Sequence, residues 1–168
     1  MVFAGRLQEQ KGVATLVELV KMMADDDRYH FHIFGSGSQE SMLDAIRDLP
    51  HVSIHPPLFG LSAYLASFDY VLMPSLHEGL ATLSIEASLS HTPTIINDCP
   101  GLRDTMPADW PLKVTGNDME MYRNLFKNII PNGNRQLWGN DAYEFASQRF
   151  TIQQMQKQYE RLYASRTS

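Results

Sequence analysis

The sequence predicts an α/β protein in which six parallel strands form one sheet and helices cover both of its faces. Short apolar runs recur along the chain and seldom alternate with polar residues, as is typical of strands buried on both faces. Between these runs, apolar residues recur every three or four positions, which indicates amphipathic helices. Regular alternation of the two patterns favours right-handed crossovers and a parallel sheet.

The six apolar runs are predicted to be strands because they are brief and often β-branched or aromatic. In chain order they are Val2–Ala4, Phe31–Phe34, Val52–Ile54, Tyr70–Met73, Thr94–Ile96 and Leu112–Val114. A chain that opens directly on a core strand is unusual. We therefore expect that further sequence lies upstream.

The helices in the first half of the chain begin after turn residues. One follows Lys11-Gly12 and places on one face Val13, Leu16, Val17, Val20 and Met23. Another follows the glycine-rich turn at Gly35–Gly37 and carries Met42, Leu43 and Ile46. A short helix fits Ser62–Ser67, and a further helix is expected to start near Thr82.

The last third of the chain is predicted to be mostly helical. The segment Asn117–Glu120 resembles a capping box, and the helix behind it ends at Pro131–Gly133. A weaker helical pattern over Gln136–Gln148 is interrupted by Gly139. The final helix has Thr151 as its N-cap and Gln154 at the capping-box position, and its apolar stripe comprises Ile152, Met155, Tyr159 and Leu162.

Composition limits the classes of function. A length of 168 residues suffices for one domain with a substantial core. The formal net charge of −5 argues against a nucleic-acid binder or an anionic-membrane binder, although a local basic site is compatible with it. The single cysteine, Cys99, is expected to be a small packed residue in a reducing compartment. No secretory signal and no apolar run of about 18 residues is present, so a cytoplasmic protein is expected.

Unusual residues cluster directly after the predicted strands. Ligands of parallel sheets bind beyond the carboxyl ends of the strands, where these residues would meet. In strand order the residues are Arg6, then Gly35 and Gly37, then Pro56-Pro57, then Glu78-Gly79, then Asn97-Asp98. Their occurrence on one rim indicates a single site.

Arg6 and Lys11 flank the entry into the first helix and are candidates to hold an anion together with the free amides of the helix N-terminus. The alternative is that both are solvated loop cations. The turn Gly35–Gly37 is not a dinucleotide fingerprint, because the position of the third glycine is taken by Glu40. It is interpreted instead as a tight strand-to-helix turn that forms one wall of the predicted ligand site.

Two carboxylates stand eight positions apart around the fourth strand end. Glu78 lies in the turn, where it is either a ligand-orienting group or an ordinary exposed glutamate. Gly79 permits close approach of the backbone to a ligand, and the amides of Ala81, Thr82 and Leu83 are expected to be unsatisfied and able to hold phosphate oxygens. Glu86 falls on a helix face expected to be partly buried; it either accepts hydrogen bonds from the two hydroxyls of a ribose or pairs with a cationic side chain.

The six histidines do not predict a catalytic or metal site. His77 and His91 lack an Asp or Ser partner at a useful spacing, so both are interpreted as loop residues. The remaining four flank strands, and their spacing matches no zinc pattern: His30, His32, His51 and His55.

Taken together, these segments resemble the C-terminal domain of GT-B-fold, retaining glycosyltransferases of the family 4 type. The matching segments are Phe3–Gly12, Phe31–Gly37, Tyr70–Gly79, Ser84–Ala87 and Thr92–Asn97. The E-x7-E motif of that family is matched by Glu78 and Glu86. The resemblance extends from about residue 2 to residue 163 and includes the last helix.

The resemblance implies a Rossmann-like three-layer sandwich that is one half of a GT-B enzyme. Residues 1–168 would be the nucleotide-sugar-binding domain, and the N-terminal acceptor domain would be absent. Arg6 and Lys11 would hold the donor diphosphate, Glu78 would touch the sugar ring, and Glu86 would bind the ribose hydroxyls. The donor site would also include Gly35, Gly79, Leu80, Ala81, Thr82 and Leu83.

The implied reaction moves a sugar from a nucleoside diphosphate, UDP in preference to GDP, to an acceptor hydroxyl with retention of configuration. Neither a metal nor another cofactor is expected, since the cations and the helix dipole would carry the charge of the leaving group. The expected acceptor is a lipid-linked glycan of O-antigen or capsule type, met in the cytoplasm or at the inner face of a bacterial membrane. Leu80-Ala81-Thr82 departs from the Phe-Gly-Leu common in the family, which is expected to alter the sugar accepted.

Two other functions fit the sequence. One is a nucleotide-sugar 2-epimerase, which shares the fold and the diphosphate site. The other is a flavodoxin-like binding module without chemistry, in which Glu78 and Glu86 would be incidental.

Overall fold

A computed structural model describes residues 1–164, apart from the side chains of Gln158, Arg161, Leu162 and Ala164. It confirms the predicted fold class, because six strands form one parallel sheet in the order β3-β2-β1-β4-β5-β6. The strands are β1 (Val2–Ala4), β2 (Phe31–Phe34), β3 (Val52–His55), β4 (Val71–Met73), β5 (Thr94–Asn97) and β6 (Lys113–Val114). Every predicted strand is present, with ends that differ by at most one residue.

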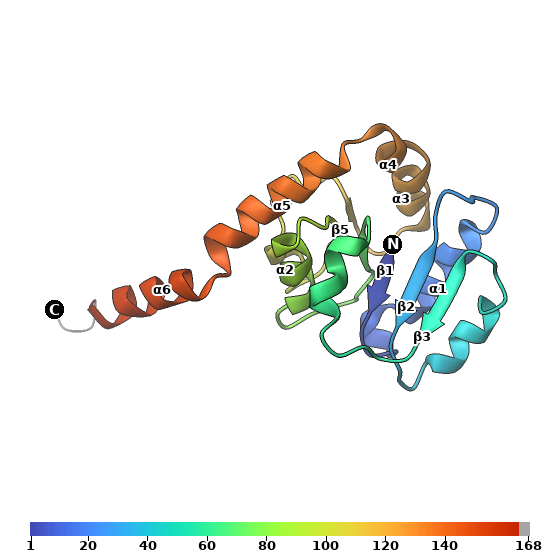
Figure 1. Ribbon diagram of the computed structural model, residues 1–168, viewed down its shortest axis with the longest axis horizontal. Helices are drawn as coiled ribbons and strands as arrows, with labels where there is room; N and C mark the ends of the chain where they lie inside the picture. Colours follow the sequence, from blue (N-terminus) through green and yellow to red (C-terminus); the bar gives the residue numbers. More distant parts are fainter. Residues whose placement is uncertain (165–168) are drawn as a thin grey trace.

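The helices form two groups that sandwich the sheet (Figure 1). In one group α1 (Val13–Met22) contacts η2 (Glu40–Ala45) and α3 (Met119–Asn124). In the other, α2 (Thr82–Leu89) contacts η3 (Leu61–Ser67), α5 (Arg135–Arg149) and strands β4 and β5. The shorter segments are η1 (Glu9–Lys11), η4 (Arg103–Thr105), η5 (Leu125–Ile129) and α4 (Ile130–Asn132).

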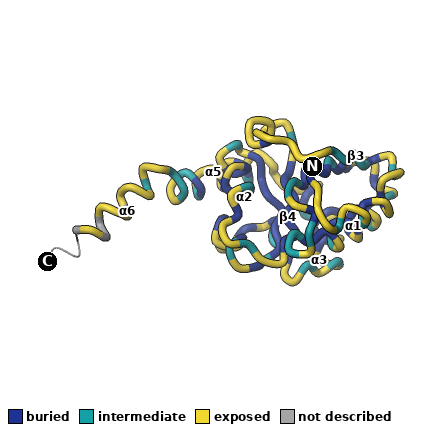
Figure 2. Tube along the Cα trace, turned by 90° about the horizontal axis from the view of Figure 1, so that it is seen from below, coloured by how far each residue is buried: buried dark blue, intermediate teal, exposed yellow. Residues whose placement is uncertain are grey.

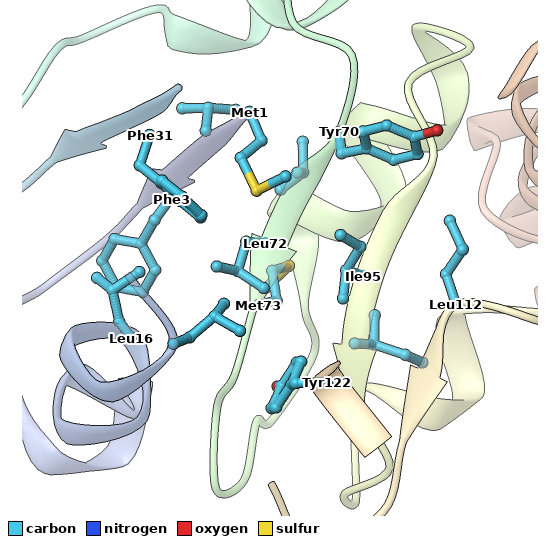
Figure 3. Close-up of a cluster of buried hydrophobic side chains, with 14 of the residues drawn as sticks. Met1, Phe3, Leu16, Phe31, Tyr70, Leu72, Met73, Ile95, Leu112 and Tyr122 are labelled. Atoms are coloured by element: carbon cyan, nitrogen blue, oxygen red, sulfur yellow. The ribbon is translucent and has the colours of Figure 1, made fainter. Parts of the chain in front are cut away.

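The hydrophobic core extends along the central strands. Phe3, Leu72 and Ile95 contribute side chains from β1, β4 and β5, with Leu16 and Tyr122 packed nearby (Figure 3). Burying each large apolar side chain contributes about 1.5–3 kcal/mol, so the three strands form a rigid platform. Cys99 is buried, as predicted.

The strand order creates a topological switch point between β1 and β4. From β1 the sheet continues to β2 on one side and to β4 on the other, so the loops after β1 and β4 leave in opposite directions. In sheets of this kind the crevice at the switch point is the usual ligand site. Arg6 follows one of these strands and Glu78 follows the other.

Two local predictions in the C-terminal third are wrong. The N-cap of α3 is Asp118, whose Oδ1 accepts a hydrogen bond from the Met121 amide at 2.8 Å, whereas Asn117 precedes the helix with a φ of 54°. Gly139 does not interrupt α5, which is continuous from Arg135 to Arg149. A Cβ at Gly139 would lie 2.4 Å from the carbonyl oxygen of His91, so this glycine permits α5 to pack closely against the turn after α2.

The final helix, α6 (Ile152–Ala164), projects from the body of the molecule (Figures 1 and 2). Thr151 is its N-cap as predicted, since its Oγ1 accepts from the Gln154 amide at 3.3 Å. The members of the predicted apolar stripe that the structure describes, Ile152, Met155 and Tyr159, are all exposed, and the Leu162 side chain lies outside the described residues. Within residues 1–164, no helix combines the length and hydropathy that a membrane span requires.

Two histidines touch across the edge of the sheet. His32 Nδ1 on β2 lies 3.3 Å from His55 Nε2 on β3, and the rings stack at 15°. A hydrogen bond between two imidazoles requires one neutral nitrogen as the acceptor. Burial lowers the pKa of His32, and the positive charges of His30, the chain N-terminus and His55 lower it further. Burial also lowers the pKa of His30, helped by the N-terminus, His51 and His55.

We predict that the protein loses stability as the pH falls, in part because His32 at the sheet edge becomes protonated. His32→Gln should reduce this loss. Above pH 6.5 both folded and unfolded states are neutral at His32. Below it the unfolded chain binds the proton first, so stability falls as the pH drops towards the lowered folded pKa. The melting-temperature difference between pH 7.5 and pH 5.5 should shrink by about 2 °C in the variant. His77→Gln, which changes an exposed loop histidine, should leave the difference as in the wild type; an equal change in both variants would contradict the assignment to the strand edge.

Candidate functional site

A partly buried ion pair joins the loops after β1 and β4. Lys11 Nζ lies 2.7 and 2.9 Å from the two carboxylate oxygens of Glu78, and Ser75 Oγ donates to Glu78 Oε1 at 2.7 Å. The Glu78 side chain is 7% exposed and that of Lys11 is 20% exposed. The carboxylate of Glu78 is therefore held by neighbouring side chains. The alternative that Glu78 is an ordinary exposed turn glutamate is wrong.

Glu86, by contrast, is exposed, and the expectation that its helix face is partly buried is wrong. Helix α2 buries Ser84, Ile85, Ala87 and Ser88 and leaves Glu86 on the opposite side. In the part of the chain that the structure describes, the Glu86 carboxylate has no hydrogen bond or ion pair. The alternative that it pairs with a cationic side chain is thereby removed for the described residues.

Close backbone packing brings Lys11 to Glu78. Gly12 has a φ of 71°, and a Cβ there would lie 2.0 Å from the carbonyl oxygen of Pro74, so only glycine fits. The Leu76 amide donates to the Gln10 carbonyl at 2.8 Å, and Gln10 Nε2 donates to the His77 carbonyl at 3.1 Å. Gln10 thus binds η1 to the loop that carries Glu78.

Arg6 follows β1 on the same rim and is exposed. Among residues 1–164 its guanidinium has no hydrogen-bond or ion-pair partner, so its charge is available to an anion. The loop that carries it rests on the glycine turn: the Leu7 amide donates to the Ser36 carbonyl at 2.9 Å, and a Cβ at Gly37 would lie 2.4 Å from the Leu7 carbonyl oxygen. A Cβ at Gly35 would likewise lie 2.2 Å from the carbonyl oxygen of Gly5. The assignment of Gly35 to a donor site stays a prediction.

The start of α2 forms the next part of the rim. The Thr82 amide donates to the Leu80 carbonyl at 2.9 Å, so the prediction of a free amide is wrong for Thr82. For Ala81 and Leu83 it is confirmed, because within the described residues neither amide has an acceptor. A Cβ at Gly79 would meet no atom within 4 Å, which leaves the space beside this backbone open to a ligand.

A cleft of about 760 Å³ lies between α2 and the junction of α5 with α6. Three of the predicted donor residues line it, namely Leu80, Thr82 and Glu86, whereas Arg6, Lys11 and Glu78 lie outside. The predicted residues therefore form two areas joined by the segment from Glu78 to Thr82. Sequence reasoning missed the residues on the other walls, since they follow no strand: Asp104, Arg149, Phe150 and Thr151. It also missed Ser75 and Gln10, whose polar side chains beside Glu78 and Lys11 were the available signal.

Comparisons with known proteins identify a consistent set of relatives. A family model described as "Glycosyl transferases group 1" matches residues 1–128. The 2-deoxystreptamine glucosyltransferase of Streptomyces kanamyceticus is 32% identical over 111 residues, which cover 62% of this chain and 29% of the relative. The chain spans less than half the length of the curated relatives it matches.

Solved structures agree on the fold. That of Anabaena Alr3699/HepE in complex with UDP and glucose aligns with a TM-score of 0.80 at 16% identity, covering 98% of this chain and 47% of that one. The C-terminal domain of a glycosyl transferase group 1 family protein (LpcC) from Francisella tularensis aligns with a TM-score of 0.73 at 15% identity, covering 90% of this chain and 85% of that one.

We predict that Lys11 and Glu78 are energetically coupled. Lys11→Met alone leaves a buried carboxylate without its cation, whereas Lys11→Met with Glu78→Gln removes both charges. The double variant should lose about 1–3 kcal/mol less free energy of unfolding than the sum of the single variants. Urea denaturation of the four proteins measures this coupling.

The exposed pair Arg47–Asp44, at 3.1 Å with side chains 50% and 66% exposed, is the matched control. Its coupling should stay below about 0.5 kcal/mol, as for other surface pairs. Similar values for the two pairs would show that burial adds nothing to the Lys11–Glu78 interaction.

Proposed function

Because this chain belongs to the glycosyl transferases group 1 family, we propose that residues 1–168 are the C-terminal, donor-binding domain of a retaining glycosyltransferase. The domain would bind a nucleoside diphosphate sugar, with UDP preferred over GDP, and an N-terminal domain would bind the acceptor. Two structural relatives support this. One contains UDP and glucose, and the other is the C-terminal domain of a group 1 protein that aligns over most of its length.

The observation that carries the proposal is the Lys11–Glu78 pair at the switch point, with unpaired Arg6 on the same rim. Arg6 supplies a free cation to the diphosphate, and the amides of Ala81 and Leu83 add two donors at the start of α2. The overall charge of −5 repels a diphosphate, so affinity depends on these local groups.

Charge develops on the diphosphate as the bond to the sugar breaks. Lys11 and the helix dipole are held in place by the fold and stabilise that charge with little reorganisation, and the exposed guanidinium of Arg6 adds a further positive charge. Lys11 reaches the diphosphate by sharing its ammonium hydrogens between Glu78 and a phosphate oxygen. The carboxylate of Glu78 retains lone pairs that accept from a sugar hydroxyl, and the proposed step uses no metal ion.

The remaining assignments concern the rest of the donor and the acceptor. Glu86 lines the cleft beside α2, as do Leu80 and Thr82, and would accept from the ribose hydroxyls. Gly79 would let the donor approach the backbone before Leu80. The acceptor would be a lipid-linked glycan of O-antigen or capsule type, used on the cytoplasmic side of a bacterial membrane. Leu80-Ala81-Thr82 would set the sugar accepted.

We predict that the chain binds UDP more tightly than uridine and that Arg6→Ala removes most of the difference. The loss of one charge-assisted contact of about 1.5–3 kcal/mol should weaken UDP at least about tenfold and leave uridine unchanged. Isothermal titration calorimetry at two salt concentrations measures both, and the salt dependence should flatten in the variant.

Lys21→Ala is the control, since it removes one exposed cation from the last turn of α1. Equal losses of UDP affinity in the two variants would show that Arg6 acts only through the net charge of the protein. Stabilisation by FMN rather than UDP would favour a flavin-binding module and contradict the donor site.

We predict that Glu86→Ala weakens UDP and uridine by the same factor, about tenfold or more, because its proposed contacts are to the ribose that both share. Glu18→Ala, an exposed carboxylate on α1, should change neither affinity. Unchanged calorimetric affinities in Glu86→Ala, with the melting temperature retained, would remove Glu86 from the site.

A further inference from the structure

The segment Pro74–Glu78, referred to below as the glutamate loop, is held by other parts of the chain. Two of its consecutive carbonyls are bound by asparagine side chains. Asn117 Nδ2 donates to the Pro74 carbonyl and Asn97 Nδ2 to the Ser75 carbonyl, each at 2.8 Å. The next residues bind η1 through Gln10, and the Glu78 amide donates to the Pro100 carbonyl at 3.0 Å. The position of Glu78 therefore depends on three distant segments.

The two asparagines also bind each other, and the orientation of both amide groups is determined by their partners. The carbonyls of the glutamate loop only accept, so each asparagine must turn its nitrogen towards them. The oxygens that remain then receive donors: Asn97 Oδ1 accepts from the Asn117 amide at 3.0 Å, and Asn117 Oδ1 accepts from the Tyr122 hydroxyl at 2.9 Å. Every contact of this network pairs one donor with one acceptor.

Asn117 does not cap the helix that follows it. Asp118 caps α3, while Asn117 adopts a left-handed backbone with a φ of 54°, which asparagine tolerates better than most residues. Its anchor, Tyr122, is fully buried and belongs to the same hydrophobic core as Met73 at the end of β4 (Figure 3). Burial raises the pKa of Tyr122, so its hydroxyl remains a donor at physiological pH.

We propose that Asn117, held by Asn97 and Tyr122, is a positioning residue for the Lys11–Glu78 pair. The carbonyl of Pro74 is enclosed between Asn117 and Gly12, directly after Lys11. Ser75, whose carbonyl binds Asn97, donates its hydroxyl to Glu78. Asn117 thus sets both members of the pair without touching a ligand. Its effect on a ligand rests on the proposed function, whereas its effect on the loop does not.

Amide hydrogen exchange of the 168-residue chain tests the positioning itself. Asn117→Gly keeps the left-handed backbone and removes the side chain. Exchange at the amides of Leu76 and Glu78 should become at least about tenfold faster, while the amides of α1 and β2 keep their rates. Asn134→Ala is the matched control, since it removes an asparagine whose Oδ1 caps α5 through the Leu137 amide at 3.1 Å. It should leave Leu76 and Glu78 unaffected.

Tyr122→Phe provides a second, milder variant in case Asn117→Gly unfolds. It removes one hydroxyl and should accelerate the same two amides by a smaller factor. If either folded variant lowers the melting temperature but leaves exchange at Leu76 and Glu78 unchanged, Asn117 is merely structural and the proposal is overturned.

Calorimetry with UDP and uridine then tests the consequence for the ligand. Asn117→Gly should weaken UDP about three- to tenfold and uridine much less, because the displaced groups face the diphosphate and sugar. Faster exchange with unchanged UDP affinity would overturn the effect of Asn117 on the ligand and support its positioning of the loop alone. If the wild-type chain binds no UDP, the proposed function fails, and the exchange rates still decide whether Asn117 positions the pair.

Discussion

The candidate site depends on one partly buried interaction, the ion pair between Lys11 and Glu78. It joins the loops that leave β1 and β4 at the point where the sheet changes direction. Burying two charges is costly unless both are well bonded. Here Glu78 accepts from Lys11 and Ser75, and the surrounding backbone is bound by Gln10 and Pro100. The cost of burial is thus offset by hydrogen bonds that also restrict the position of both side chains.

The charged groups of the rim fall into two kinds with different physical roles. Lys11 and Glu78 neutralise each other and are held in place, while the side chains of Arg6 and Glu86 are exposed and have no partner in the described part of the chain. Paired charges shape a site before any ligand arrives, which lowers the reorganisation needed on binding. Unpaired charges attract and discriminate between ligands. The proposed ligand, a nucleoside diphosphate sugar, would need both, since it carries a compact anion at one place and hydroxyl groups at others.

Glycines determine how closely the loops approach. At Gly12 the carbonyl oxygen of Pro74 occupies the space that a Cβ would need. Gly101 has a φ of 76°, and a Cβ there would lie 2.0 Å from the carbonyl oxygen of Glu78. Gly79 differs, because the space beside it is open. Some glycines therefore build the rim, and one leaves room beside it.

Sequence by itself determined the fold class, all six strands and the rim residues after them. Those features follow from local apolar patterns and turn residues, and the direction of parallel strands places their carboxyl ends on one edge. Only the tertiary structure decided that Glu78 is buried and Glu86 exposed, that Asp118 rather than Asn117 caps α3, and that Gly139 continues its helix. The partners responsible lie far along the chain: Lys11 is 67 residues from Glu78 and Pro74 is 43 from Asn117. Burial and hydrogen-bond partners at such separations depend on how the elements pack, which local sequence patterns do not encode.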